Sequence, residues 1–347
     1  MIEWLSDYGM FLAQALTVVA AVLIVVAGIA VAGQRMRPAE GGQIEVRRLN
    51  ERYDAMRDAL RSAALDSRSY RKLRKREAKE KARAAKLAGD KSEAPRAFVL
   101  DFDGDLRAGA VDALREEISA VLTLARTGDS VLLRLESPGG VVHGYGLAAA
   151  QLARLREREL RLVVCVDKVA ASGGYMMACV ANEVISAPFA VLGSIGVLAQ
   201  LPNLNRLLRK HDIDYEVITA GQFKRTLTLF GRNTEEGRRK FREELDETHA
   251  LFKEHVARWR PALDLELVAT GETWYGSRAL PLGLVDRLGT SDQWLQDAAE
   301  SGTVLLEVSY TERKRLGERF GDLLEASVSR GIGRALDRLR AEDSHHQ

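Results

Sequence analysis

The sequence predicts an α/β domain built on a largely parallel sheet, and three observations support this fold class. From residue 96 onward, short apolar runs rich in valine alternate with longer segments whose apolar residues recur at helical spacing. Several of the short runs end in glycine-rich turns. The alternating order is the one expected when helices connect neighbouring parallel strands by right-handed crossovers.

Strand and helix patterns follow one another along this domain in a regular order. In the first half we expect strands and helices alternately over residues 97–104, 109–127, 129–140, 144–159, 160–169 and 174–181. The last range is assigned as a buried helix because its apolar residues do not alternate and follow a glycine pair. In the second half we expect a strand, a helix, a strand and a long helix over residues 183–197, 201–213, 214–221 and 234–259.

Composition and charge divide the chain into five parts. They are a leader (1–9), an apolar segment (10–32), a basic segment (33–95), the α/β domain (96–300) and a C-terminal strand with an amphipathic helical arm (301–347). Residues 35–91 hold 18 Lys or Arg against 9 Asp or Glu, whereas the total net charge is only +2. The balanced total therefore hides one strongly basic segment beside a mildly acidic body.

Residues 10–32 form an uncharged apolar run in which Gln14 and Thr17 are the only polar side chains. As a helix this run would be about 34 Å long, which is enough to cross a bilayer. A cleaved signal peptide is the alternative, but the leader is acidic and the apolar run is too long for one. We therefore expect a single transmembrane helix. Basic residues follow it from Arg35 onward, so the positive-inside rule places the body of the protein in the cytoplasm.

The basic segment is predicted to be a helical stalk. Apolar residues between Val46 and Ala63 recur every three or four positions, as in a short coiled coil. Residues 68–86 are charged all round and are either a solvated spacer or a surface for anionic lipid head groups. Nucleic-acid binding is not expected, because no series of aromatic side chains is interleaved with the basic residues.

The stretch DKVAASGGYMMACVAN, residues 167–182, places one small hydroxyl at the predicted junction of a buried strand and a buried helix. Two alanines precede Ser172 and two glycines follow it, and glycine permits unusual backbone angles and close approach of another chain segment. Ser172 is either the cap of the helix or a nucleophile. The G-x-S-x-G pattern is not matched, because Ala170 stands two positions before the serine.

Two further glycine-rich loops follow predicted strands, ESPGG at residues 136–140 and LGSIGV at residues 192–197. In open α/β sheets, ligands bind beyond the carboxyl ends of the strands. The backbone N–H groups of Gly139 and Gly140 could therefore point at the same place as Ser172.

A nucleophilic serine also needs a base, and the sequence offers two kinds. His143 follows the ESPGG loop, and Lys224 lies in a stretch with apolar or hydroxyl-bearing neighbours on both sides. Exclusion of water from a lysine favours its neutral amine, and Ser–Lys pairs are a known form of nucleophile and base. Cys165 and Cys179 lie in apolar runs without the spacing of a metal site, so no metal is expected.

Four motifs in this order resemble the signal peptide peptidase A family of serine peptidases. They are ESPGG at 136–140, KVAASGGYMMA at 168–178, GSIGV at 193–197 and AGQFKRTLTLFG at 220–231. The anchor, the basic stalk and FKRTLTLFGRNTEEGR at 223–238 are most similar to its SohB branch. The resemblance covers nearly the whole chain.

The resemblance implies a role for each residue that matches a family motif. These are the nucleophile Ser172, the general base Lys224, the lysine-orienting Ser194 and the oxyanion-hole N–H groups of Gly173 and of Gly140 or its neighbour Gly139. The family's K-S-A motif reads Lys224-Arg225-Thr226 here, a departure that concerns the substrate cleft more than the chemistry. No metal, nucleotide or other cofactor is implied.

The resemblance also implies a fold, partners and a location. The family's fold is similar to that of ClpP and the crotonases, a spiral of β-β-α units, and its members form ring-like oligomers in which neighbouring subunits can share an active site. Peptides or proteins are the implied substrates. Relatives lie in the bacterial inner membrane with the catalytic domain outside the cytoplasm, whereas the charge asymmetry of this chain favours the cytoplasmic side.

The sequence as a whole predicts a membrane-anchored serine endopeptidase that hydrolyses peptide bonds through an acyl-enzyme. One alternative is an inactive, membrane-tethered scaffold of the same fold that only binds peptides or assembles rings. Another is a crotonase-like enzyme that acts on acyl thioesters. Labelling of Ser172 by a serine-reactive probe separates the peptidase from the scaffold, and acyl-CoA binding would indicate the thioester enzyme.

Overall fold

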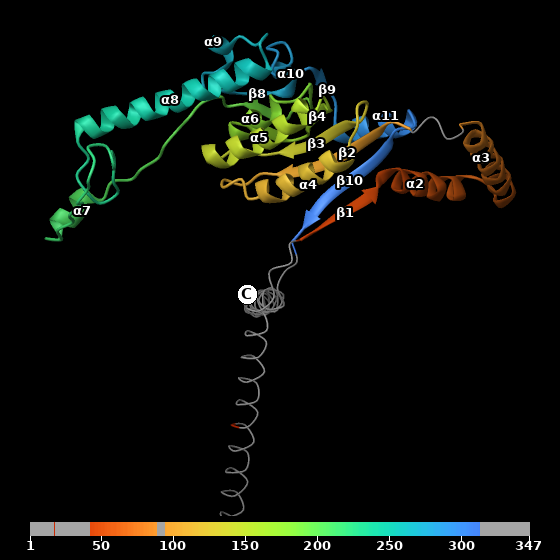
Figure 1. Ribbon diagram of the computed structural model, residues 1–347, viewed down its shortest axis with the longest axis horizontal. Coiled ribbons are helices and arrows are strands. Elements are labelled where there is room, and N and C mark those ends of the chain that lie inside the picture. The colour runs from red at the N-terminus through yellow and green to blue at the C-terminus, as the bar shows by residue number, and fades with distance from the viewer. Residues whose placement is uncertain (1–16, 18–41, 89–93, 313–347) are drawn as a thin grey trace, which may run out of the picture. The chain divides into compact units, whose positions relative to one another are not determined.

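The computed structural model describes residues 17, 42–88 and 94–312 (Figure 1). Chain contacts divide the molecule into two units, of which Ile44–Tyr310 is one and carries the features below. Apart from Thr17, the predicted transmembrane helix at residues 10–32 lies outside the described residues, as does the predicted C-terminal arm beyond residue 312. Within the described ranges, no helix combines the length and the apolar character that a membrane crossing requires.

A seven-stranded sheet forms the centre of the fold. Its strands lie in the spatial order β1 (Gln43–Arg48), β10 (Val304–Thr311), β2 (Arg96–Asp103), β3 (Ser130–Glu136), β4 (Arg161–Val166), β6 (Glu183–Ser186) and β9 (Arg287–Leu288). Every neighbouring pair from β10 to β9 is parallel. The predicted α/β class with largely parallel strands is therefore confirmed.

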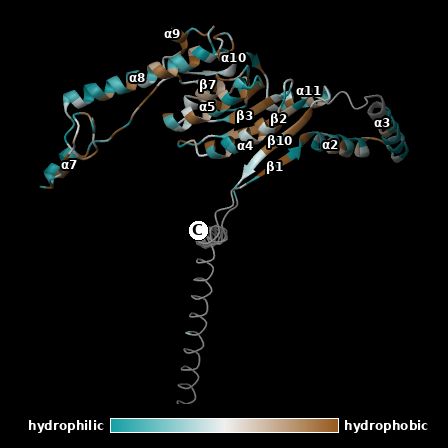
Figure 2. Ribbon diagram, in the orientation of Figure 1, coloured by the Kyte–Doolittle hydropathy of each residue, from teal (hydrophilic) through white to brown (hydrophobic). Residues whose placement is uncertain are grey.

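Both faces of this sheet are covered, which explains the continuous apolar runs of its strands. Along β3, Val131 and Leu133 contribute to one core cluster and Leu132 to another, because successive side chains of a strand point to opposite faces. The first cluster takes in α4 (Val111–Leu124), α5 (Val142–Glu157) and α6 (Gly173–Ala178). The second cluster includes Leu49 and Leu295. Figure 2 shows the hydrophobic residues of the strands that lie between the two clusters, such as β2 and β3.

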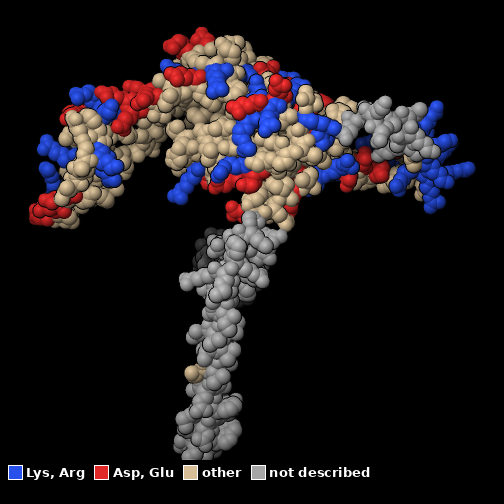
Figure 3. Space-filling model, in the orientation of Figure 1, with Lys and Arg blue, Asp and Glu red and all other residues tan. Residues whose placement is uncertain are grey.

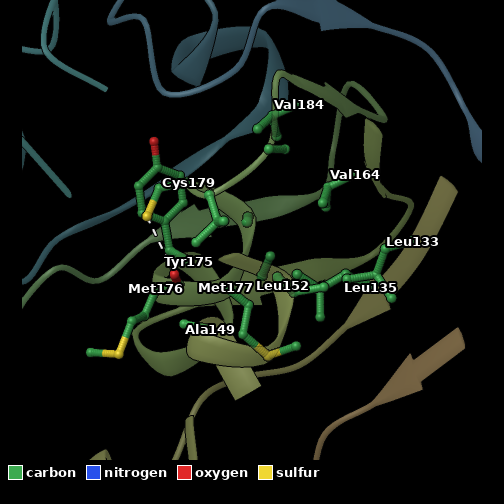
Figure 4. Packing of buried hydrophobic residues seen from close by; sticks show 14 of the residues in the cluster. Leu133, Leu135, Ala149, Leu152, Val164, Tyr175, Met176, Met177, Cys179 and Val184 are labelled. Atoms are coloured by element: carbon green, nitrogen blue, oxygen red, sulfur yellow. Dashed lines mark hydrogen bonds between the residues drawn. The ribbon is translucent and has the colours of Figure 1, made fainter. Parts of the chain in front are cut away.

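A second sheet of three short strands lies at the ends of the long ones. It contains β5 (Val169–Ala171), β7 (Val191–Gly193) and β8 (Thr273–Tyr275), with β5 parallel to β7 and β7 antiparallel to β8. The chain passes from β4 into β5 and from β6 into β7 within a few residues. Helix α6 begins directly after β5, and Figure 4 shows its side chains, including Tyr175 and Met177, beside those of β3 and β4.

The remaining helices are more peripheral. They are α2 (Leu49–Ala64), α3 (Ser67–Ala88), α7 (Asn205–Lys210), α8 (Glu235–Trp259), α9 (Leu265–Val268), α10 (Gly276–Ala279) and α11 (Ser291–Glu300). Helix α8 begins at the cap Thr234, whose side chain accepts a hydrogen bond from Gly237 N–H. Only the C-terminal half of α8 joins the main core, through the buried side chains of Phe252 and Val256.

Part of the predicted basic stalk belongs to the α/β unit. Strand β1 joins the large sheet, and Leu49 at the start of α2 is 2% exposed in the second core cluster. Val46, which the heptad reading placed on a helix, lies in β1. Farther along, α3 is strongly basic, and Figure 3 shows the Lys and Arg side chains gathered there. Leu49 and Tyr53 of this region therefore pack against the sheet, whereas Met56 and Leu60 are exposed, and coiled-coil pairing stays a prediction.

Three predicted elements of the second half differ from the structure. Residues 183–197 form two strands, β6 and β7, because the chain turns at Pro188 and moves to the other sheet. The helix expected over 201–213 is confined to Asn205–Lys210. The strand expected over 214–221 is absent, since its apolar residues are exposed and have no sheet edge to pair with.

Candidate active site

Ser172 lies at a sharp corner between β5 and α6. Its backbone angles are φ 51° and ψ −118°, a sparsely populated combination for a residue with a side chain. The corner is held on both sides, because Ser172 N–H donates to Gly193 O at 2.8 Å and Met176 N–H donates to Ser172 O at 2.9 Å. Ser172 occupies the N-cap position of α6, as the capping interpretation expected, but its hydroxyl makes no capping hydrogen bond there.

The loop after β3 abuts this corner. Gly139 has φ +88°, and a Cβ atom added to it would lie only 2.7 Å from both Ser172 Cβ and Gly173 N. Only glycine can therefore bring this loop so close to the serine while holding that backbone angle. These contacts agree with the sequence-based expectation for Gly139, and Gly140 lines the same cavity as Ser172.

The backbone donors near the corner are not equivalent. Gly139 N–H donates to Ser137 Oγ at 3.1 Å, so this donor is already engaged. Among the residues that the structure describes, neither Gly140 N–H nor Gly173 N–H has a hydrogen-bond partner. The pair of donors left free for a ligand is thus Gly140 and Gly173, rather than Gly139 and Gly173.

Ser194 lies at a second strained corner beside the first. It follows β7 with φ 52°, and its N–H donates to Glu272 O at 2.6 Å. The preceding residue, Gly193, is the one whose carbonyl holds Ser172 N–H. Ser172 and Ser194 consequently line the same cavity.

The cavity at these two serines has a volume of about 820 Å³ and an apolar lining. Its walls come from the loops after β3 and β7, from α6 and from α8; the apolar contributors include Leu106, Val142, Met176, Val197, Leu198, Leu251 and Phe252. Asp, Glu, Lys and Arg are absent from the described lining. Such a site favours an uncharged, apolar part of a ligand next to the hydroxyls.

Two histidines of α8 also line the cavity, and the sequence analysis did not select them. His255 Nε2 lies 2.9 Å from Met176 O, and burial lowers the pKa of this imidazole, so it stays neutral and donates from Nε2. His249 Nε2 is buried without a partner among the described residues. Their spacing around Phe252, three residues on either side, is the signal that could have placed them on one helix face. His143, the histidine considered as a base, is exposed and outside the lining.

Lys224 is not brought to Ser172 within one chain. It is exposed in the segment 198–233, which we call the arm, and it is absent from the described cavity lining. Its neighbours contact the start of α8: Gln222 Nε2 donates to Glu236 at 3.2 Å, and the Lys240 amine lies 5.7 Å from the Phe223 ring centroid. Figure 1 shows α7 and the loop after it at this end of α8.

The length of α8 measures the separation between the part of the arm around Lys224, which lies beside the start of this helix, and the serine corner. His255, which contacts α6 through Met176 O, follows Lys240 by 15 residues, which corresponds to about 22 Å along the helix. That is far beyond the reach of one lysine side chain. Ser172, Ser194 and the glycine donors are therefore together in a single chain, and Lys224 is apart from them.

Two family models match most of the chain, and both describe the same family. Residues 3–152 match the description "Peptidase family S49 N-terminal", and residues 154–305 match "Peptidase family S49". A probable protease SohB of Haemophilus influenzae is 46% identical over 334 residues, which cover 93% of this chain and 94% of that protein. A probable protease SohB of Buchnera aphidicola is 56% identical over 246 residues, which cover 71% and 72% of the two chains.

Solved structures were also similar, at a lower level. The 1510-N membrane-bound stomatin-specific protease aligns with a TM-score of 0.40 and 10% sequence identity, over 60% of this chain and 86% of that chain. The same protease in complex with a substrate peptide aligns with a TM-score of 0.38 and 12% identity, over 60% and 81% of the two chains.

Proposed function

Since the chain belongs to peptidase family S49, we propose that it hydrolyses peptide bonds with Ser172 as the nucleophile and Lys224 as the general base. It is a membrane-associated serine peptidase by its family. The observation that carries the choice of Ser172 is its strained corner at an apolar cavity. Among the described residues, neither its hydroxyl nor the two neighbouring backbone donors of Gly140 and Gly173 has a hydrogen-bond partner. Strain of this kind collects at functional sites.

The proposed reaction is acyl transfer in two halves. The neutral amine of Lys224 takes the Ser172 proton while Oγ attacks the peptide carbonyl carbon, and the carbonyl oxygen becomes an oxyanion. The N–H groups of Gly140 and Gly173 stabilise this oxyanion. Collapse of the intermediate breaks the C–N bond, and the protonated lysine gives its proton to the leaving amine. Water then attacks the acyl carbon and loses a proton to the lysine. The bond between Ser172 Oγ and that carbon breaks, the lysine returns the proton to Oγ, and the peptide acid leaves.

Ser194 is proposed to orient the lysine. Its hydroxyl lines the cavity next to Ser172 and has no hydrogen-bond partner among the described residues. A hydroxyl in this place can accept a hydrogen bond from an incoming amine and hold it toward Ser172. Ser172 and Ser194 therefore form a site that can bind a lysine amine, although Lys224 of the same chain does not reach it.

A second copy of this chain is the proposed source of that lysine. Exposed apolar side chains crowd the arm: Leu198, Leu201, Leu204, Leu207, Ile213, Tyr215, Val217, Ile218 and Phe223. Among the described residues, no buried hydrophobic side chain lies between Ile195 and Phe252. An apolar segment without a core of its own needs a partner surface. A ring of copies, each placing its arm and Lys224 on the next, would satisfy this need and close each site.

The membrane anchor is proposed from the sequence. Residues 10–32 are long and apolar enough for one crossing, in a bacterial inner membrane. The family favours a periplasmic catalytic domain and the charge asymmetry a cytoplasmic one, and a reporter fused to the C-terminus distinguishes the two. The passage of β4 into β5 and of β6 into β7 supports the proposal that the domain is a ClpP- and crotonase-like spiral of β-β-α units.

Labelling with a fluorophosphonate probe tests the proposed nucleophile. The full-length wild-type protein should react at one residue, identified by peptide mass as Ser172, and Ser172→Ala should abolish the label while Ser194→Ala retains it. Cleavage of a casein or peptide library by the wild type, lost in Ser172→Ala, completes the test. A protein that assembles and binds peptides but neither labels nor cleaves would be the inactive scaffold.

A further inference from the structure

A fully buried tyrosine lies directly beneath the serine corner. Tyr145 of α5 is 0% exposed, and its ring packs so closely that a Cβ atom added to Gly173 would lie 2.3 Å from Tyr145 Cγ. The other edge of the ring meets Phe102 at a centroid distance of 6.2 Å. A phenylalanine would make the same apolar contacts, so the buried hydroxyl needs its own explanation.

The Tyr145 hydroxyl belongs to a chain of hydrogen bonds whose direction can be assigned. It lies 2.7 Å from Asp105 O and 2.5 Å from Ser137 Oγ. A carbonyl oxygen only accepts, so the single Tyr145 proton goes to Asp105 O. The proton between the two hydroxyls then belongs to Ser137, whose oxygen accepts from Gly139 N–H at 3.1 Å. Burial raises the pKa of the Tyr145 hydroxyl, which keeps it a donor.

The hydrogen bonds of Tyr145 and Ser137 restrain the residues on both sides of Gly140, the proposed donor. On one side it engages Gly139 N–H through Ser137. On the other side it ties down Asp105, whose neighbour Leu106 presses on Gly140: a Cβ atom there would lie 2.1 Å from Leu106 O. Leu106 O also accepts from Val141 N–H at 2.9 Å. The peptide group that carries Gly140 N–H is thus restrained by the hydrogen bonds of its neighbours Gly139 and Val141 and by the contact with Leu106.

We propose that Tyr145 and Ser137 are positioning residues of the oxyanion hole. The Tyr145 ring supports the Gly173 donor, and its hydroxyl sets the Gly140 donor through Ser137 and Asp105. One side chain therefore fixes the spacing between the two N–H groups. This inference rests on the proposed peptidase function. If the Tyr145 hydroxyl contributed only to stability, its removal would leave the positions of the Gly140 and Gly173 N–H groups unchanged.

The chain offers a matched control for this proposal. Tyr175 is also 0% exposed, and its hydroxyl donates to Leu284 O at 2.9 Å, a contact that involves neither glycine donor. Tyr145→Phe and Tyr175→Phe therefore remove the same atom from equally buried sites. Both variants should lose thermal stability, and Tyr145→Phe should lose more because it removes two hydrogen bonds rather than one; only Tyr145→Phe should disturb the oxyanion hole.

The experiment compares these variants in the full-length, assembled protein. Tyr145→Phe should lower kcat by about 10- to 100-fold at unchanged KM, because donor placement matters in the transition state and hardly in the ground state. A peptide aldehyde, which forms a tetrahedral adduct with the serine, should bind more weakly by a similar factor. Tyr175→Phe should keep kcat and aldehyde affinity within about twofold of the wild type.

Ser137→Ala provides a second route if Tyr145→Phe fails to fold. It should also lower kcat and aldehyde affinity, and the double variant should lose no more than the worse single one, because both residues act through one chain. Equal kcat losses in Tyr145→Phe and Tyr175→Phe, or additive losses in the double variant, would overturn the proposal. Failure of the peptidase function itself is distinct, since Ser172→Ala would then retain cleavage and aldehyde binding.

Discussion

The serine corner and the arm are the two regions that the proposed chemistry needs, and they are built in opposite ways. The corner is buried, strained and held by hydrogen bonds from β7, α6 and the loop after β3. The arm has exposed apolar side chains and contacts mainly itself and the start of α8. Under the proposed mechanism, this difference means that one chain prepares the nucleophile by itself, whereas its base is placed by assembly.

Loss and recovery of activity provide the strongest test of this comparison. Ser172→Ala and Lys224→Ala should each lower kcat by at least about 10⁴-fold. In rings formed by equal mixing of the two inactive variants, about a quarter of the sites should combine an intact Ser172 with an intact neighbouring Lys224. Peptidase assays on the mixture measure this directly. Activity that stays at the level of the single variants would show that serine and lysine must come from the same chain.

The two regions should also respond differently to the same backbone change. Gly139→Ala at the corner should cost about 2–6 kcal/mol of unfolding free energy, because strain at φ +88° adds to overlap with Ser172 and Gly173. Gly221→Ala in the arm should cost about 1–2 kcal/mol, since φ is +100° but the nearest atom, Lys224 Cβ, is 3.9 Å away. Urea denaturation compares the two, and equal costs would argue against tight packing at the corner.

A charge placed on the arm should break assembly and spare the fold. Ile218 is 93% exposed, and Ile218→Asp should weaken association by about 30-fold if the side chain is central to the interface, with activity lost in parallel. Leu124→Asp, at an exposed site on α4, is the control and should change neither. Analytical ultracentrifugation and peptidase assays provide the readouts. An Ile218→Asp protein that assembles normally would remove the arm from the interface.

The smallest effect expected is a change in how strongly the unfolding temperature depends on pH, and it should occur in a His255 variant but not in a His211 variant. Burial lowers the pKa of His255, so the unfolded chain binds a proton at a pH where the folded chain does not, and stability falls as the pH drops through about 6.5. His255→Gln can still donate to Met176 O and should make the unfolding temperature less dependent on pH between 7.5 and 5.5. His211→Gln, at an exposed arm position, should leave that dependence unchanged.

The corner could be predicted from the sequence because its determinants are local. Glycines beside a single serine, between two apolar runs, permit few other arrangements, and Ser172, Gly139 and Gly173 lie together as expected. The α/β class followed from strand and helix periodicity for the same reason. The choice of Gly140 over Gly139 could not be made, since it depends on a hydrogen bond from Gly139 N–H to Ser137.

The arm could not be predicted because its apolar residues resemble those of a core. Tyr215, Val217 and Ile218 have the composition of a strand, yet no strand forms, since no partner strand lies within the described chain. The remoteness of Lys224 depends on the length and direction of α8, which local pattern does not fix. His249 and His255 were missed because the cavity they line forms only when α8 packs on α6.

Because α8 separates Lys224 from the serine corner, the proposed mechanism makes the unassembled protein inactive in the cell. A newly synthesised chain folds with its proposed nucleophile already at the cavity, while its proposed base lies beside the far end of α8, whose stretch from Lys240 to His255 alone is about 22 Å long. Under the proposed assembly, such a chain is latent without any inhibitor or propeptide. Peptidase activity then rises steeply with the local concentration of the protein, and a single unassembled chain does not cleave nearby proteins.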